Sequence, residues 1–141
     1  MLTPIILAVL AGAGPELDRR PIDVVGAPRP AHPRNADPLS LRYRTALREA
    51  AARKPGFAGH YVLAQIGCGA GCLRVAAIDR AGGGVVWFPH TVSGWPLAVT
   101  EPLGYRRTSR LLVVQGMLDE QGPSATRTFL FDGRRFVPMH P

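Results

Sequence analysis

The sequence predicts a single α+β domain, in which one N-terminal helix packs on an antiparallel meander sheet of five to six strands. Three observations support this fold class. The 141 residues are enough for one hydrophobic core and too few for two ordinary domains. Helical spacing of apolar residues occurs in one segment, and the chain after it consists of short apolar runs separated by glycine-rich turns. Hydrophobic residues make up 46% of the chain, which is typical of a globular protein.

The first residues predict export. Residues 1–13 are apolar and uncharged and end in Ala11-Gly12-Ala13, which resembles the small-residue cleavage site of a signal peptide. This run is shorter than the ~20 residues that a membrane-spanning helix needs, so we expect no transmembrane anchor. We therefore expect a periplasmic or secreted protein. Residues 14–37 are rich in proline and arginine and predict an extended spacer, which leaves residues 38–141 as the single domain.

The segment after the spacer predicts the helix, from about Pro38 to Arg53. Asp37 is a good N-cap residue, Pro38 suits the first turn, and Pro55-Gly56 ends the segment. Arg44 and Arg48 are expected on the solvated face. The apolar positions that recur at helical spacing are Leu39, Tyr43, Ala46, Leu47 and Ala50.

The rest of the chain predicts strands. Asp132-Gly133 is a strong signal for a two-residue hairpin turn. The segment from Pro89 to Gly104 contains three prolines and is interpreted as a long loop with a short strand at Leu97 to Val99. The main predicted strands are Ala58 to Gly67, Leu73 to Asp79, Val85 to Phe88, Arg110 to Leu118, Thr126 to Phe131 and Phe136 to Met139.

Two cysteines, Cys68 and Cys72, predict a structural disulfide across a hairpin tip. An exported chain meets an oxidising compartment, and a three-residue hairpin loop would place the two residues opposite each other. Gly71 stands where such a loop requires a left-handed backbone. The symmetric register predicts the cross-strand pairs Ile66 with Arg74, Ala64 with Ala76, Val62 with Ile78 and Tyr61 with Asp79.

The cysteine pair has two alternative interpretations. A redox-active pair is less favoured, because the spacing is Cys-x-x-x-Cys rather than Cys-x-x-Cys and no thioredoxin-like pattern surrounds it. A metal site that includes His60 or His90 is chemically feasible, since two thiolates and an imidazole can hold Zn²⁺ or Cu⁺. The spacing identifies no third ligand, so we assign no metal and no cofactor.

The sequence favours a non-enzymatic protein. Ser93, His90 and Asp79 supply the residue types of a hydrolase triad, but no Gly-x-Ser-x-Gly motif presents the serine. A hydrolase is therefore the least favoured function, and we assign no catalytic residue.

Charge and aromatic residues favour a binding function instead. The net charge of +7, carried by sixteen Arg and one Lys, should attract anionic partners such as phospholipid headgroups, lipopolysaccharide or acidic proteins. The arginines are scattered and no nucleic-acid-binding motif occurs, so nucleic acid is not expected.

The loop from Pro89 to Arg110 and the cysteine hairpin would face an anionic envelope component or a protein. The oligomeric state is not predicted. The candidate binding residues are His60, Tyr61, Trp87, His90, Trp95, Tyr105, Arg106 and Arg110. The aromatic ones are equally suited to a core or lid.

One set of motifs carries a resemblance. Phe57-Ala58-Gly59-His60-Tyr61, then Gly67-Cys68-Gly69 with Cys72, and later Ala77-Ile78-Asp79 and Ser109-Arg110-Leu111-Leu112, resemble a group of uncharacterised exported bacterial proteins. The likeness spans about Phe57 to Leu118. It implies an envelope location and supplies no activity, catalytic residue or ligand.

Overall fold

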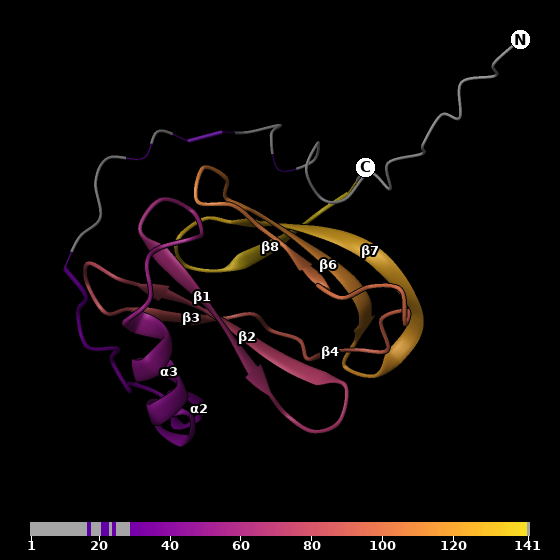
Figure 1. Ribbon diagram of the computed structural model, residues 1–141, viewed down its shortest axis with the longest axis horizontal. Coiled ribbons are helices and arrows are strands. Elements are labelled where there is room, and N and C mark those ends of the chain that lie inside the picture. Colours follow the sequence, from indigo (N-terminus) through magenta and orange to yellow (C-terminus); the bar gives the residue numbers. More distant parts are fainter. Residues whose placement is uncertain (1–16, 18–20, 23, 25–28, 141) are drawn as a thin grey trace, which may run out of the picture.

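The described part of the chain forms an antiparallel sheet of eight strands, with two short helices at its N-terminal side (Figure 1). The computed structural model describes Leu17, residues 21–22, Val24 and residues 29–140. The predicted α+β class with a mainly antiparallel sheet is confirmed. The predicted signal peptide lies outside the described residues, and so do residues 14–16, 18–20, 23 and 25–28 of the predicted spacer.

The strands are more numerous than predicted, and they do not form a simple meander. The order across the sheet is β1-β2-β4-β6-β7-β8, while β3 pairs with β2 and β5 pairs with β6. The predicted strand at Leu97 to Val99 is absent. Strands β4 and β5 have only two residues each, so they carry no alternating pattern that a sequence could reveal. The bounds are β1 Tyr61–Gly67, β2 Cys72–Asp79, β3 Val85–Trp87, β4 Val92–Ser93, β5 Leu103–Gly104, β6 Leu111–Leu118, β7 Gln121–Phe131 and β8 Phe136–Met139.

The single helix predicted from Pro38 to Arg53 is wrong in detail. Two helices, α2 (Pro38–Arg42) and α3 (Arg44–Ala51), are separated at Tyr43, whose backbone has φ −103° and ψ 21°. Asp37 caps α2 as predicted, because its carboxylate accepts hydrogen bonds from the Ser40 backbone N–H (2.8 Å) and hydroxyl (2.6 Å). The hydrogen bond from the Ser40 hydroxyl contributes most to the lowered pKa of Asp37.

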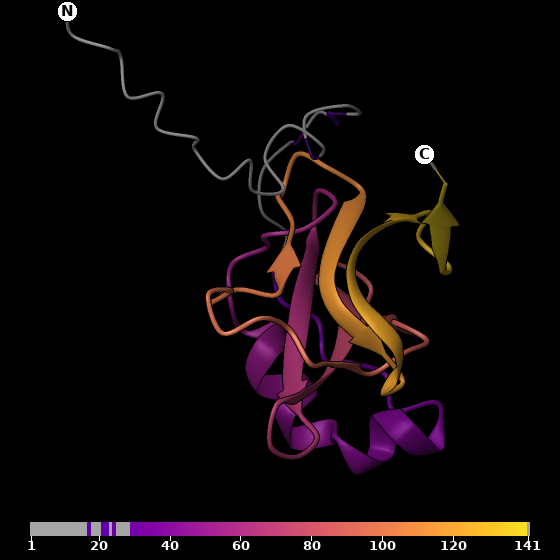
Figure 2. The same cartoon turned by 90° about the vertical axis from the view of Figure 1, so that its right-hand side faces the viewer.

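Strands β1 and β2 bury side chains on both faces. One face, with Val62, Ala64 and Ile66 of β1, packs against Leu47 and Ala50 of α3. The other face, with Leu63 of β1 and Val75 of β2, packs against residues of β6, β7 and β8 in the main core. Both faces are buried because alternate residues of a strand point to opposite sides. Figure 2 shows how strongly β6 and β7 bend, which lets the two halves of the sheet face each other. The main core comprises Phe57, Ala58, Leu63, Val75, Ala77, Phe88, Val92, Leu103, Leu112, Val114, Phe129, Phe131 and Phe136.

The segment from Phe57 to Tyr61 is a tight turn that begins the sheet. Phe57 and Tyr61 exchange backbone hydrogen bonds, and Ala58 and Gly59 between them have φ of 45° and 90°. The backbone N–H groups of Ala58 and Gly59 also donate to carbonyls of the segment before β6, those of Ser109 (3.1 Å) and Arg107 (2.7 Å). This motif of the resemblance therefore has a structural role: it positions β1 against the β5–β6 connection.

The cysteine hairpin agrees with its predictions. Cys68 and Cys72 form a disulfide with their Cα atoms 5.1 Å apart, and Gly71 has a φ of 65°. The four predicted cross-strand pairs between β1 and β2 are confirmed. The Cys68 N–H donates to the Cys72 carbonyl at 3.1 Å, so backbone and disulfide close the same short loop.

We expect the Cys68→Ser/Cys72→Ser variant to unfold with a free energy about 2 kcal/mol lower than that of the wild type. The reason is that a loop of about five residues restricts the unfolded chain only slightly. Urea denaturation of both proteins measures the difference. Reduced wild type should unfold like the variant. A loss twice as large would show that the bridge supports more than its own turn.

Candidate anion-binding site

The end of the predicted spacer is docked on the turn that joins β2 and β3. The Ala31 N–H donates to the Arg80 carbonyl at 2.9 Å, and the Arg34 N–H donates to the Gly83 carbonyl at 2.7 Å. The Arg34 guanidinium also donates to the Gly82 carbonyl at 3.1 Å. Gly83 has a φ of 78°, and a Cβ there would lie 2.3 Å from the His32 carbonyl oxygen, so only glycine permits this approach. The docking holds residues 31–35 in a fixed path beside α3.

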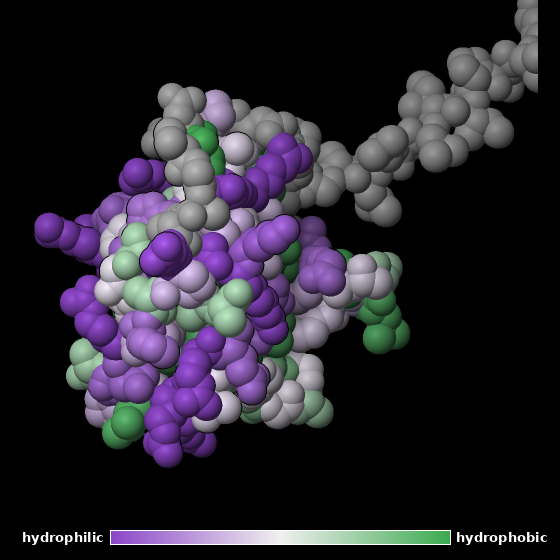
Figure 3. All heavy atoms as spheres, turned by 60° about the vertical axis from the view of Figure 1, so that its left-hand side comes forward, coloured by the Kyte–Doolittle hydropathy of each residue, from purple (hydrophilic) through white to green (hydrophobic). Residues whose placement is uncertain are grey.

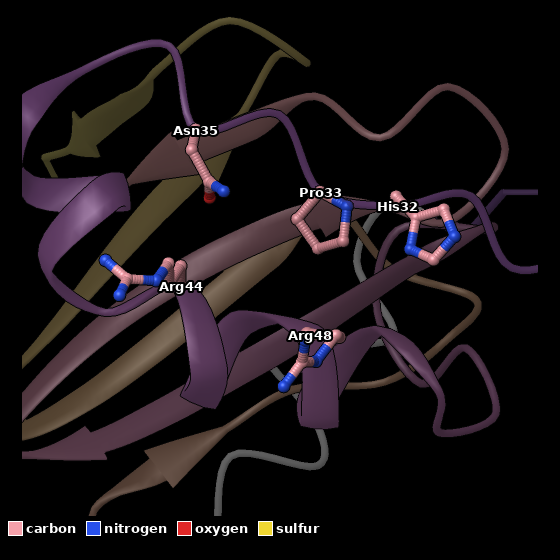
Figure 4. A pocket seen from close by; sticks show the side chains of 5 residues that line it. All are labelled: His32, Pro33, Asn35, Arg44 and Arg48. Carbon is pink, nitrogen blue, oxygen red and sulfur yellow. The ribbon is translucent and has the colours of Figure 1, made fainter.

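Between this path and α3 lies a half-open pocket of about 190 Å³. Arg44 and Arg48 line it from α3, where they stand one turn apart. Figure 4 shows His32, Pro33 and Asn35 on the opposite wall, with the Asn35 side chain directed toward the space above the helix. The pocket therefore exists only because the hydrogen bonds to the β2–β3 turn hold residues 31–35 opposite α3.

Among the described residues, no carboxylate neutralises the positive charge of the pocket. Within the described ranges, no Asp or Glu lines it, and neither Arg44 nor Arg48 forms an ion pair; the Arg44 guanidinium makes one long hydrogen bond, to the Leu41 carbonyl at 3.4 Å. Figure 3 brings the helix side of the molecule forward and shows mostly hydrophilic side chains there. Guanidinium groups bind phosphate and carboxylate oxygens through paired hydrogen bonds, and Asn and His side chains add further donors.

The size of the pocket limits its occupant. Its volume of about 190 Å³ is smaller than the ~300–1,000 Å³ of ordinary small-molecule sites. It can accommodate a phosphoryl or carboxylate group with part of what carries it.

His60 and Tyr61, two of the predicted binding residues, lie together at the start of β1. The His60 imidazole Nε2 is 3.3 Å from Asp79 Oδ1, and its ring stacks on Tyr61 at 4.8 Å. Burial raises the pKa of the Tyr61 phenol, and the nearby Asp79 carboxylate raises it further, while Arg110 opposes the shift. These contacts link the residue before β1 to the end of β2, so the geometry of the pair fits a fixed end of the β1–β2 hairpin.

His90 lies in a second, separate pair. Its Nδ1 is 2.6 Å from Asp119 Oδ2 in the β6–β7 turn, and the other oxygen of Asp119 accepts a hydrogen bond from the Thr91 N–H at 3.0 Å. The hydrogen bond with His90 contributes most to the lowered pKa of Asp119. The pair ties the loop after β3 to the β6–β7 turn.

The predicted aromatic binding residues are mostly packed. Trp95 and Tyr105 contact the main core, and Tyr105 meets the Phe57 ring edge-on at 6.1 Å. Trp87 packs on the α3 side, where its indole N–H donates to the Ser40 hydroxyl at 2.9 Å. Arg106 and Arg110 are exposed, on the connection between β5 and β6. The eight predicted residues therefore do not form one site.

The residues of the hydrolase hypothesis are not brought together either. Asp79 pairs with His60 rather than with His90, and the buried Ser93 hydroxyl has no hydrogen-bond partner among the described residues. Both cysteine sulfurs are engaged in the disulfide, so neither is a free ligand. The described ranges contain no cluster of three or more His, Cys, Asp and Glu side chains suited to a metal ion. In the same part of the chain, no helix has the length and apolar character needed to cross a membrane.

Sequence reasoning missed the pocket because it assigned Arg44 and Arg48 only to a solvated helix face. Their spacing of four residues was a visible signal that both would lie on one face. The opposite wall was not visible, because it depends on hydrogen bonds between residues 31–34 and a turn almost fifty positions later in the chain.

Comparisons with protein-family models, with curated proteins and with solved structures found no match to this chain.

Proposed function

We propose that the protein is an exported, non-enzymatic binding module that holds an anionic group of an envelope component in the pocket beside α3. The observation that carries this proposal is the pair Arg44 and Arg48, which face a preformed pocket with no acidic residue among its described lining. A net charge of +7 adds long-range attraction for an anionic partner.

Other features support export and binding rather than catalysis. The disulfide is compatible with an oxidising compartment, where such bridges persist. The two histidine–carboxylate pairs lie apart, and the hydrogen bonds and ion pairs of the described residues join neither pair to a serine or a thiolate side chain. The thiol-redox and metal-binding alternatives would both require reduction of the Cys68–Cys72 bridge.

The chemistry of the pocket favours a phosphate group. Two guanidinium groups can bind several oxygens of one phosphoryl group, and phosphate offers more acceptor oxygens than a single carboxylate. Such a group can come from a phospholipid headgroup or from a small phosphate ester. The test must therefore separate these two sources.

The experiment measures co-sedimentation with vesicles of phosphatidylglycerol and of phosphatidylcholine at physiological salt. We expect the wild type to bind only the anionic vesicles, and Arg44→Ala/Arg48→Ala to bind them about thirtyfold more weakly, because each cation near such a surface contributes about 1 kcal/mol. Inorganic phosphate, titrated at constant ionic strength, should compete if the pocket recognises the phosphate itself.

The matched control is Arg134→Ala/Arg135→Ala, which removes the same charge from the β7–β8 turn. We expect this variant to lose much less affinity. An equal loss in both variants would mean that net charge alone causes binding. Wild type that binds neither the anionic vesicles nor inorganic phosphate would contradict the proposed function.

A further inference from the structure

Asp79, the last residue of β2, holds the turn that leads to β3. Its carboxylate oxygen Oδ1 accepts hydrogen bonds from the Ala81 N–H (2.9 Å) and the Gly82 N–H (3.1 Å). Its backbone carbonyl accepts a further bond from the Gly83 N–H at 2.7 Å, and its own N–H donates to the Gly84 carbonyl at 2.8 Å. A run of three glycines has wide conformational freedom, so these bonds to Asp79 are what fixes the path of the turn.

The other side of the same turn holds the spacer. Three carbonyl groups of the turn accept hydrogen bonds from Ala31 and Arg34 of the spacer. The turn therefore directs N–H groups toward Asp79 and carbonyl groups toward the spacer. If the carboxylate of Asp79 is lost, two N–H groups lose their acceptor, and the carbonyls that hold the spacer are no longer fixed in position.

The spacer residues that dock on the turn are interleaved with those that line the pocket. Ala31 and Arg34 are held by the turn, whereas His32, Pro33 and Asn35 form the pocket wall opposite α3 (Figure 4). Each residue of an extended segment spans only about 3.3 Å, so neighbouring residues move together. A change in the shape of the turn would therefore shift this wall relative to the two guanidinium groups on α3.

We infer that Asp79 is a positioning residue of the anion pocket, an inference that rests on the proposed function. Asp79 does not line the pocket, so it acts through the β2–β3 turn and the spacer that is docked on it. Because thermodynamic coupling is reciprocal, an anion that binds to the docked arrangement also stabilises the docking. The affinity for the anion therefore depends on a side chain outside the pocket.

The charge of Asp79 has the opposite effect on anion binding. Removal of one carboxylate raises the net charge above +7, which strengthens the long-range attraction for an anion. Loss of the hydrogen bonds within the turn weakens binding, because it releases one wall of the pocket. The direction of the change therefore separates the two causes.

The test compares Asp79→Ala with Asp79→Asn in a titration with inorganic phosphate at constant ionic strength, followed by the Arg44 Nε–H resonance. Both variants remove the charge, but the side-chain carbonyl of Asn can still accept the two N–H groups of the turn. We expect Asp79→Ala to bind phosphate about tenfold more weakly than the wild type, and Asp79→Asn to stay within about twofold of it.

Hydrogen exchange adds a measurement that does not depend on affinity. In phosphate-free buffer, the amides of Ala31 and Arg34 should exchange faster in Asp79→Ala than in the wild type, because both donate to carbonyls of the turn. In the wild type, saturating phosphate should slow the exchange of the same two amides.

Asp132→Ala is the matched control. Asp132 Oδ1 accepts the N–H groups of Arg134 and Arg135 in the same way, and no hydrogen bond among the described residues joins that turn to the spacer. This variant should bind phosphate at least as tightly as the wild type. His60→Ala removes the 3.3 Å contact between His60 Nε2 and Asp79 Oδ1 but leaves both turn hydrogen bonds, so it should also retain binding.

Phosphate binding by Asp79→Ala that equals or exceeds that of the wild type would overturn the inference and leave the proposed function intact. A wild type whose Arg44 resonance does not respond to phosphate would instead contradict the proposed anion binding, and this inference with it. If Asp79→Ala does not fold by circular dichroism, Gly83→Ala takes its place. Its Cβ would meet the His32 carbonyl oxygen and displace the spacer, while Asp79 keeps its hydrogen bonds. Unchanged binding by folded Gly83→Ala would overturn the inference equally.

Discussion

Replacing Phe57 with alanine should lower the free energy of unfolding by about 3–5 kcal/mol, which is the usual cost of removing a buried phenylalanine side chain. Phe57 is completely buried, and its ring contacts those of Tyr105, Phe131 and Phe136 at 5.4–6.3 Å. It also begins the tight turn that starts β1. The substitution therefore leaves a cavity where both halves of the sheet meet, and denaturant unfolding measures its cost.

The matched control for Phe57 is Leu41→Ala, because Leu41 is half exposed on α2 and outside the core. We expect this control to change the free energy of unfolding by no more than about 0.5 kcal/mol. A Phe57→Ala protein as stable as the control would contradict the placement of Phe57 at the centre of the core.

Substitution of Gly116 by alanine should have the second largest effect, a loss of about 2–4 kcal/mol. Gly116 lies at the irregularity in the β6–β7 pairing and has a φ of 149°. A Cβ there would lie 2.6 Å from the Ser93 carbonyl oxygen and 3.2 Å from Val92 Cγ1. Strand β4 would have to move away from β6, which breaks a short connection between the two halves of the sheet.

Gly67→Ala is the control for Gly116, because a Cβ at Gly67 would have no atom within 4 Å and its φ is not positive. We expect Gly67→Ala to leave the unfolding transition nearly unchanged. Equal melting temperatures for the Gly116 variant and the wild type would mean that β4 can shift at no cost.

Local turn chemistry made the β1–β2 hairpin predictable. The three-residue loop between Cys68 and Cys72, with Gly71 in the left-handed position, determines the register of every residue pair in the two strands. The position of the β7–β8 hairpin was also predictable, from Asp132-Gly133, but its register was not, because Phe131 pairs with Phe136 and residues 132–135, rather than two residues, join the strands. In both, the information lies within about twenty neighbouring residues.

Elements that depend on distant contacts were not predictable. Strands β4 and β5 are two residues long and exist only because β2 and β6 pair with them. Trp95 and Tyr105 were candidate binding residues that suit a core or lid equally well, because amphipathic aromatic side chains are found in both places. In the folded protein both side chains pack against the main core. This packing depends on the curvature of the sheet, which the sequence pattern does not predict.

The candidate site was predictable in part. The helix that carries Arg44 and Arg48 was expected, and so was the positive charge, but the pocket needs the spacer to lie across the β2–β3 turn. Gly83 permits that approach, and glycine in a Gly82-Gly83-Gly84 turn gives no indication of the segment it will meet.

The central claim is that Arg44 and Arg48 bind an anionic group in the pocket, and side-chain NMR of the arginine Nε–H groups tests it most directly. During a titration with inorganic phosphate at constant ionic strength, the resonances of Arg44 and Arg48 should shift together and saturate, while those of Arg134 and Arg135 stay nearly constant. Small, non-saturating shifts of equal size at all four arginines would contradict the claim.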